Sequence, residues 1–178
     1  MISLMRLTIA FLVGSLALGT SPAMAACEKS TVQTTRDLNI GLLRYQPGLK
    51  SGWALISPNG ALSLSSGLSL SSRTPTYSGQ VMLRARPGYD VALSIEVDAP
   101  ALGGSSKVTE VYADVSRGSI SHASNIWFVK VPLEANDFEF TTIQIDIGAY
   151  FSFSKIGSRT DKLEPSSVRV RCLFERPF

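Results

Sequence analysis

The chain has 178 residues, of which 44% are hydrophobic and only 17% are charged. This length is typical of one domain with a substantial core, and a charged fraction below the usual ~25% suits a β-rich exported protein better than a cytosolic helical one. The net charge of +3, which falls to +2 if a leader carrying Arg6 is removed, is too slight to indicate a nucleic-acid partner.

Residues 1–25 have the three parts of a secretory signal peptide. Arg6 supplies the positive charge, residues 7–18 are apolar, and Ala23-Met24-Ala25 places small residues before a cleavage site. The apolar stretch has about a dozen residues, short of the ~20 that a membrane-spanning helix needs, and no other segment is long enough to span. We expect cleavage after Ala25 or Ala26 and a mature chain with no transmembrane segment.

Two cysteines occur, Cys27 and Cys172, one near each end of the expected mature chain. Outside the cytoplasm such a pair is expected to form a disulfide, whereas two cysteines alone make a poor metal site. One alternative stays open, because Met24-Ala25-Ala26-Cys27 loosely resembles the lipobox of a lipoprotein. In that case Cys27 would carry a lipid.

The first part of the expected mature chain alternates weakly between polar and apolar residues. Residues 27–36 form a polar, Thr-rich arm, and the alternation of Leu38, Ile40 and Leu42 predicts a first strand. Residues 53–56 and 61–64 are apolar runs that flank Asn59-Gly60, which is a strong hairpin signal because both residues tolerate positive φ.

Residues 78–98 predict two half-buried strands separated by Pro87-Gly88. The residues expected on their buried faces are Val81, Leu83 and Ala85 in the first, and Val91, Leu93, Ile95 and Val97 in the second. Pro87-Gly88 fits a type II turn, whose twist suits a tight hairpin poorly. The two strands therefore either join through a wider loop or cross between sheets.

The second half predicts further strands. Val111, Ala113 and Val115 alternate, residues 116–124 form a polar connection, and residues 126–131 are a dense apolar run typical of a central strand. Residues 138–154 carry the cleanest alternation, with Gly148 as a site for a bend or bulge. The expected inward residues there are Ile143, Ile145, Ile147, Ala149, Phe151 and Phe153; those of the last strand are Val168, Val170, Cys172 and Phe174.

No segment of useful length after the leader has the helical period, and turn signals recur at short spacing. We therefore expect about eight to ten strands in an all-β, antiparallel β-sandwich of immunoglobulin-like or pilin-like type. It would form a single domain over residues 26–178.

Three segments of the mature chain resemble the DUF4402 family of exported bacterial domains, which lies near the pilin and adhesin β-sandwiches. They are DLNIG at residues 37–41, the strand, Pro-Gly turn and strand at residues 78–97, and IDIGAYFSF at residues 145–153. Residues 159–166 depart from the Gly-x-Tyr-x-Gly turn that is usual before the family's final strand. The resemblance implies fold and export; the family offers no enzymatic activity to transfer.

The chemistry-bearing residues form no recognisable catalytic, cofactor or metal motif. His122, the only histidine, lies in a Ser-rich stretch that we interpret as a solvated loop, and no Gly-x-Ser-x-Gly motif occurs. The acidic residues are scattered without calcium-binding spacing. Trp53 and Trp127 are candidates for stacking on sugars, although aromatic residues within apolar strands usually belong to the core.

Four arginines that alternate with apolar residues are a candidate surface contact: Arg84, Arg86, Arg169 and Arg171. The plainer interpretation is a charged, solvent-facing surface that also discourages edge pairing. The functional interpretation is a contact surface for an anion or a polysaccharide.

We expect a non-enzymatic, exported structural or adhesive module of the cell surface, with an association with a pilus as one form. Its partners would be surface-assembly proteins or a glycan. The alternative is a periplasmic or secreted domain that binds a small ligand or glycan. We further expect the folded unit to be a monomer with its own last strand, because residues 27–36 contain a single aliphatic residue, Val32, and make a poor donor strand.

Overall fold

The computed structural model describes residues 27–71, 74–100, 105–133, 139–154, 161–162 and 165–178. The expected signal peptide lies outside these ranges. Every regular element within them is a β-strand and every strand pair is antiparallel, as the alternation predicts. The same ranges contain no helix long and apolar enough to cross a membrane.

Thirteen strands occur in the described ranges, more than the eight to ten expected, because three of them have only two or three residues. They are β1 (Thr31–Arg36), β2 (Leu42–Tyr45), β3 (Ser51–Ile56), β4 (Leu62–Leu64), β5 (Leu68–Leu70), β6 (Gly79–Ala85), β7 (Tyr89–Val97), β8 (Ser105–Val115), β9 (Ser119–Ala123), β10 (Ile126–Lys130), β11 (Thr141–Ser154), β12 (Asp161–Lys162) and β13 (Val168–Pro177).

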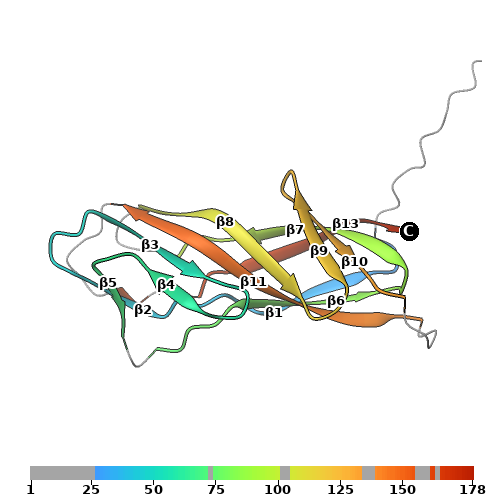
Figure 1. Cartoon of the computed structure of the whole chain (residues 1–178), viewed down its shortest axis with the longest axis horizontal. Coiled ribbons are helices and arrows are strands. Elements are labelled where there is room, and N and C mark those ends of the chain that lie inside the picture. Colours follow the sequence, from blue (N-terminus) through green and yellow to red (C-terminus); the bar gives the residue numbers. More distant parts are fainter. Residues whose placement is uncertain (1–26, 72–73, 101–104, 134–138, 155–160, 163–164) are drawn as a thin grey trace, which may run out of the picture.

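The fourteen-residue strand β11 organises the largest sheet (Figure 1). On one edge of β11, β6 pairs with residues 141–147 and β3 pairs with residues 149–154. On the other edge β8 pairs with residues 145–154. Outside these strands, β1 pairs with β6 and β4 pairs with β3, which gives six strands in total.

Gly148 lies where β6 gives way to β3 on that shared edge. A Cβ at Gly148 would be 2.3 Å from the carbonyl oxygen of Ile56 and 2.8 Å from the carbonyl carbon of Ser57. Glycine is therefore required at position 148 because the neighbouring backbone leaves no room for a side chain, and not because of the bulge that the sequence suggests there. The register shift of β11 against β8 falls between Tyr150 and Phe151, where Thr109 is the extra residue.

The second sheet has the order β13-β7-β10-β9, and a small third sheet has the order β12-β2-β5. The third sheet lies at the end of the molecule opposite the C-terminus (Figure 1). Since β6 and β7 belong to different sheets, the chain crosses between sheets at Pro87-Gly88, which is one of the two alternatives left by the sequence. Gly88 takes a φ of 76°, the left-handed conformation that a type II turn requires.

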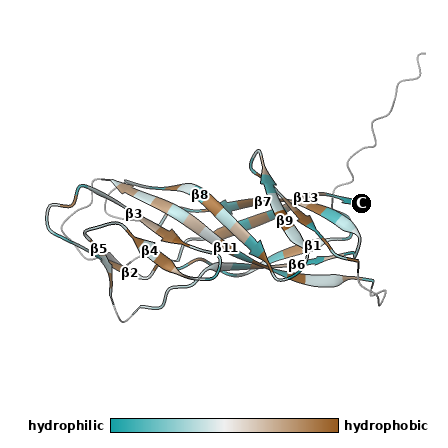
Figure 2. Ribbon diagram, viewed as in Figure 1, coloured by the Kyte–Doolittle hydropathy of each residue, from teal (hydrophilic) through white to brown (hydrophobic). Residues whose placement is uncertain are grey.

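Both larger sheets contribute to one hydrophobic core. All six residues expected inward on β11 are buried, as are the inward residues of β6 and β7. Apolar and polar bands follow one another along β8 and β11 in Figure 2, which is the period-two pattern of strands with one buried face. The predicted hairpin is confirmed as β3 and β4, and the predicted central strand as β10, which has β7 and β9 on its two sides.

Of two predictions for the region before β3, one is wrong and one holds only in part. The polar arm at residues 27–36 contains β1, which pairs along its length with β6; it is an edge strand, so a single half-buried aliphatic residue, Val32, is sufficient. The strand predicted from the alternation of Leu38, Ile40 and Leu42, within residues 37–45, forms only over its last four residues, as β2. Leu38 and Ile40 are buried, but Gly41 has a φ of 83° and interrupts the extended chain before β2 begins.

The polar connection predicted at residues 116–124 is also wrong, because it contains β9. β9 forms a hairpin with β10 through Ser124 and Asn125, whose φ values of 50° and 65° are those of a type I′ turn. Four of the five residues of β9, SISHA, are exposed, so the sequence needs only one large aliphatic residue. The strand could not be recognised from this composition, because it is the pairing with the apolar strand β10 that holds it in place.

Candidate functional site

A cleft of about 640 Å³ lies between β7 of one large sheet and β8 of the other. It forms because β10 pairs only with residues 90–93 of β7, so that residues 94–97 have no strand on that edge within the described ranges. In the same ranges β8 pairs only with β11 and leaves its other edge open. Volumes of about 300–1,000 Å³ are typical of small-molecule sites.

The floor of the cleft is apolar. Ile95 and Trp127 are each 7% exposed, while Val108 and Val111 are half-buried and pack against the core. Val108 and Val111 face inward because β8 holds them opposite buried residues of β11. The floor is therefore a part of the core that the open edges leave accessible.

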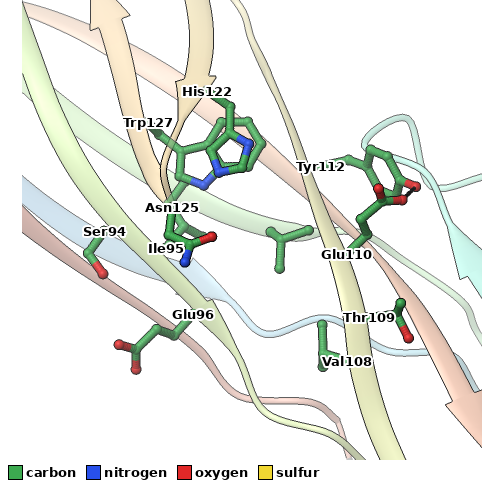
Figure 3. Close-up of a pocket in the computed structure, with 11 residues that line it drawn as sticks. Ser94, Ile95, Glu96, Val108, Thr109, Glu110, Tyr112, His122, Asn125 and Trp127 are labelled. Carbon is green, nitrogen blue, oxygen red and sulfur yellow. Dashed lines mark hydrogen bonds between the residues drawn. The ribbon is translucent and has the colours of Figure 1, made fainter.

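The rim of the cleft is polar and is held by the β9–β10 hairpin on one side. His122 and Trp127 are directly opposite each other in this hairpin, and their rings stack with centroids 4.3 Å apart and planes 20° apart. Figure 3 shows these two residues, with Asn125 at the hairpin turn, across the gap from Val108 on β8. His122 thus belongs to a strand and packs on an aromatic ring, which corrects its interpretation as a loop histidine.

The other face of β8 carries a second group of aromatic side chains. The Tyr112 hydroxyl donates a hydrogen bond to the carboxylate of Glu110. This hydrogen bond, together with partial burial and the negative charge of Glu110, raises the pKa of Tyr112 above its ordinary value. Both residues also line the cleft, and in Figure 3 they lie on the side of β8 away from His122 and Trp127.

Trp53 and Tyr150 continue this group on the neighbouring strands. Their rings stack with centroids 5.6 Å apart and planes 21° apart. Both point away from the core, since the adjacent residues Ala54 and Ala149 are fully buried. We call Trp53, Tyr150 and Tyr112 the aromatic row; it crosses β3, β11 and β8.

No family model, curated protein or solved structure matches this chain. The resemblance to the DUF4402 family therefore stays a prediction. What the cleft and the aromatic row do has to be inferred from their own residues.

The four arginines predicted as one surface contact lie in two separate pairs. Arg84 lies on β6, an interior strand of the six-stranded sheet, and Arg86 directly follows β6; their guanidinium carbons lie 4.5 and 5.8 Å from the ring centroid of Phe140. Arg169 and Arg171 are on β13 in the other sheet. Arg169 forms an exposed ion pair with Asp98 at 2.6 Å and approaches Glu96 at 3.6 Å, so part of its charge is already compensated.

The two tryptophans also separate. Trp127 belongs to the core, as expected for an aromatic residue in an apolar strand, although it also meets the cleft. Trp53 is half-buried on the outer face of its sheet. The described residues bring together no group of three or more His, Cys, Asp or Glu side chains that would hold a metal ion.

A disulfide joins Cys27 to Cys172, with their Cα atoms 6.0 Å apart, as the sequence predicts. It ties the segment before β1 to β13 and indicates an oxidising compartment, either extracellular or periplasmic. The segment before β1 is also held to β13 by the Glu175 carboxylate, which accepts hydrogen bonds from the backbone N–H groups of Lys29 and Ser30. A sulfur engaged in a disulfide cannot also carry the lipid of the lipoprotein alternative.

The cleft is the feature that sequence reasoning missed. Its residues come from strands that are distant in the sequence, and each has an ordinary role in its own strand. The only local signal is that β7 is longer than β10, nine residues against five, which leaves part of an edge uncovered.

Proposed function

We propose that this chain is an exported, non-enzymatic β-sandwich module that binds a small ligand in the cleft between β7 and β8. The observation that carries the proposal is the lining: an apolar floor containing Trp127, surrounded by a few hydrogen-bonding groups such as His122 and Asn125. Small-molecule sites combine these features, because the floor supplies burial and the polar groups fix the orientation of the ligand.

Several observations support the remaining parts of this proposal. Two larger sheets that share one core support a sandwich, of immunoglobulin-like or pilin-like type. The Cys27–Cys172 disulfide supports export by the signal peptide expected at residues 1–25. The absence of a Gly-x-Ser-x-Gly motif from the sequence supports binding over hydrolysis.

The second candidate is a structural or adhesive module of the cell surface, including one associated with a pilus and related to the DUF4402 family. It is favoured by exposed apolar side chains near the C-terminus. Leu133 is 76% exposed and Phe178 is 50% exposed. Both lie beside Gly88, whose carbonyl accepts a hydrogen bond from the Phe178 backbone N–H. Exposed apolar clusters of this kind are typical of contacts between proteins.

The cleft is tested by titrating isotope-labelled, disulfide-bonded protein with a small-molecule fragment library and following the backbone amide resonances. We expect bound fragments to shift resonances of β7, β8 and the β9–β10 hairpin that line the cleft. Val111→Phe should fill the cleft and weaken binding at least about tenfold, because it replaces the ligand's apolar contacts.

Val32→Phe is the matched control, since Val32 is also a half-buried valine that packs against the core, but on β1. It should leave fragment binding unchanged. If fragments shift only resonances outside the cleft, or if the two variants weaken binding equally, the proposed binding site is wrong.

A further inference from the structure

We propose that the cleft takes a short, extended peptide, an inference that rests on the proposed function because it names the class of ligand for the same site. The peptide would pair its backbone with the edge of β7 that β10 leaves uncovered, at residues 94–97. The backbone groups that this edge presents to the cleft specify such a ligand.

The pairing of β7 with β10 shows which residues of β7 face the cleft. In an antiparallel strand, the N–H and C=O groups of one residue point to one neighbouring strand and those of the next residue point to the other. The Val131 N–H donates a hydrogen bond to the carbonyl of Tyr89, in the same register that pairs β10 with β7. Every second residue after Tyr89 therefore faces the β10 side, which includes Ile95 and Val97.

The pairing of β7 with β13 gives the same assignment independently. The Asp98 N–H donates a hydrogen bond to the carbonyl of Ser167, in register with the rest of the β7–β13 pair. Ser94 and Glu96 therefore direct their backbone groups to β13. The residues between and beyond them, Ile95 and Val97, are left to face the uncovered edge.

The backbone N–H and C=O groups of Ile95 form no hydrogen bond to the part of the chain that the structure describes. β10 does not reach this residue, because the β9–β10 hairpin turns back at Ser124 and Asn125. Ile95 lines the cleft and is only 7% exposed. A ligand that covers Ile95 displaces the water that serves these groups and has to replace its hydrogen bonds, or a buried polar group is left unpaired.

An extended peptide has the spacing that this edge requires. Its donor and acceptor groups on one side repeat every second residue, about 7 Å apart, as they do from Ile95 to Val97. Its side chains alternate between two faces, and those of one face would lie over the apolar floor that includes Val108 and Val111. Figure 3 shows Ser94 and Glu96 of β7 on one side of the gap and Val108 of β8 on the other. The expected ligand therefore alternates apolar and polar residues.

The charges of the cleft indicate which polar residues suit the outward positions. The two ionised residues among its lining are Glu96 and Glu110, both acidic. Arg169 approaches Glu96 at 3.6 Å, and Lys107 is exposed on β8 outside the lining, so the negative charge is compensated only in part. Lysine therefore suits the outward positions of the peptide, whereas glutamate would be repelled.

The test follows amide hydrogen exchange in isotope-labelled, disulfide-bonded protein. The probe is a capped pentapeptide with valine at its second and fourth positions and lysine at the others. Without the peptide, the amides of Ile95 and Val97 should exchange faster than those of Ser94 and Glu96, which are bonded to β13. Saturating peptide should slow exchange at Ile95 and Val97 at least about tenfold and leave Ser94 and Glu96 unchanged, since only the first two gain a partner.

Two methylated peptides separate backbone pairing from apolar contact without altering the protein. One carries methyl groups on the amide nitrogens of its valines, and the other carries them on those of its lysines. A strand added to one edge directs the N–H groups of alternate residues to that edge. One methylated peptide should therefore bind at least about tenfold more weakly than the other. Equal binding of the two would overturn the proposed pairing.

The variants of the fragment experiment complete the test. Val111→Phe, which fills the cleft, should remove the protection of Ile95, and Val32→Phe should keep it. Fragments that bind in the cleft without any protection of Ile95 by the peptide would overturn the peptide ligand and leave the proposed function standing, whereas failure of both would overturn both. Protection that rises with protein concentration in the absence of peptide would identify a second copy of the chain as the occupant and would also overturn the proposal.

Discussion

Gly148 shows how a single residue determines the architecture of the largest sheet. The change of partner strand from β6 to β3 along one edge of β11 brings the backbone at Ile56 and Ser57 against the position of the missing Cβ. The obstacle is backbone and cannot rotate away. A side chain here therefore forces the strands apart.

Gly148→Ala should reduce the free energy of unfolding by about 3 kcal/mol, at the upper end of the usual cost of overpacking. Gly48→Ala is the control. Gly48 has open space around it but a φ of +86°, so only the conformational strain of about 1 kcal/mol applies. Urea denaturation of both variants measures the difference; equal losses would contradict the role of close approach.

The interaction between Tyr112 and Glu110 has a resolved effect on a pKa. The raised pKa of Tyr112 means that the folded state favours the protonated hydroxyl. The resulting stabilisation is complete below the ordinary tyrosine pKa of 10.0 and is lost as the pH rises through the raised value.

Glu110→Ala should lower the pKa of Tyr112 toward its ordinary value, because it removes both the hydrogen bond and the carboxylate charge. Tyrosine side-chain resonances followed through an alkaline titration measure this. Glu96→Ala, which removes a carboxylate from the other lip of the cleft, should leave the Tyr112 midpoint in place. A midpoint unchanged by Glu110→Ala would show that the contact does not form in solution.

At the scale of single elements, the β9–β10 hairpin places two non-glycine residues in the left-handed region, Ser124 and Asn125. Serine has no particular preference for this region, whereas Asn-Gly is the favoured pair for a type I′ turn. The double change Ser124→Asn with Asn125→Gly should raise the free energy of unfolding by about 1 kcal/mol. Gly60→Ala in the β3–β4 turn, with a φ of +83°, should act in the opposite direction. Thermal melting of the two variants measures both effects. A lower melting temperature for the double change than for the unchanged protein would contradict the assignment of a type I′ turn.

The same hairpin shows which strands sequence patterns reveal. β6, β7 and β11 have one buried face over many residues, and in β13 buried or half-buried residues alternate with exposed ones from Val168 to Phe174, so alternation identifies all four. β1 and β9 lie at sheet edges and bury little, so their sequences carry almost no hydrophobic period. Residues 38–42 show the opposite case, since buried Leu38 and Ile40 alternate without forming the predicted strand.

The candidate sites were harder to predict than the strands, because they depend on which strands pair and in which register. Tyr112 and Trp53 have unremarkable surroundings in the sequence, and only the register of β3, β11 and β8 brings them to one row. Arg84 and Arg169 were grouped by their similar local pattern, yet they belong to different sheets. Local alternation gives the face of a residue but not its neighbours across strands.

At the scale of the whole molecule, the disulfide closes a sequence separation of 145 residues. Restricting so long a loop in the unfolded chain corresponds to about 5 kcal/mol in the entropic model, and measured gains are often 2–4 kcal/mol. Changing Cys27 and Cys172 together to alanine should lower the free energy of unfolding by an amount in this range. A reductant should bring the unchanged protein to the stability of the variant and should not affect the variant. Equal stability with and without reductant would contradict a structural role for the bond.

We expect the folded chain to be a monomer that supplies its own last strand. A chain that needs a donated strand leaves a long groove where its own last strand would lie, but here β13 pairs with β7 from Val168 to Pro177 and is held by the disulfide. The N-terminal arm is used within its own fold, because β1 pairs with β6. Residues 26–178 expressed alone in an oxidising compartment should therefore fold to a monomer, with the mass of one chain by light scattering and a cooperative transition by calorimetry.

Any surface assembly would then use exposed groups such as Leu133 and Phe178, and Leu133→Ser should weaken it without changing the monomer. Aggregation that is relieved only by an added strand-donor peptide would refute self-sufficiency and restore strand exchange as the mode of assembly.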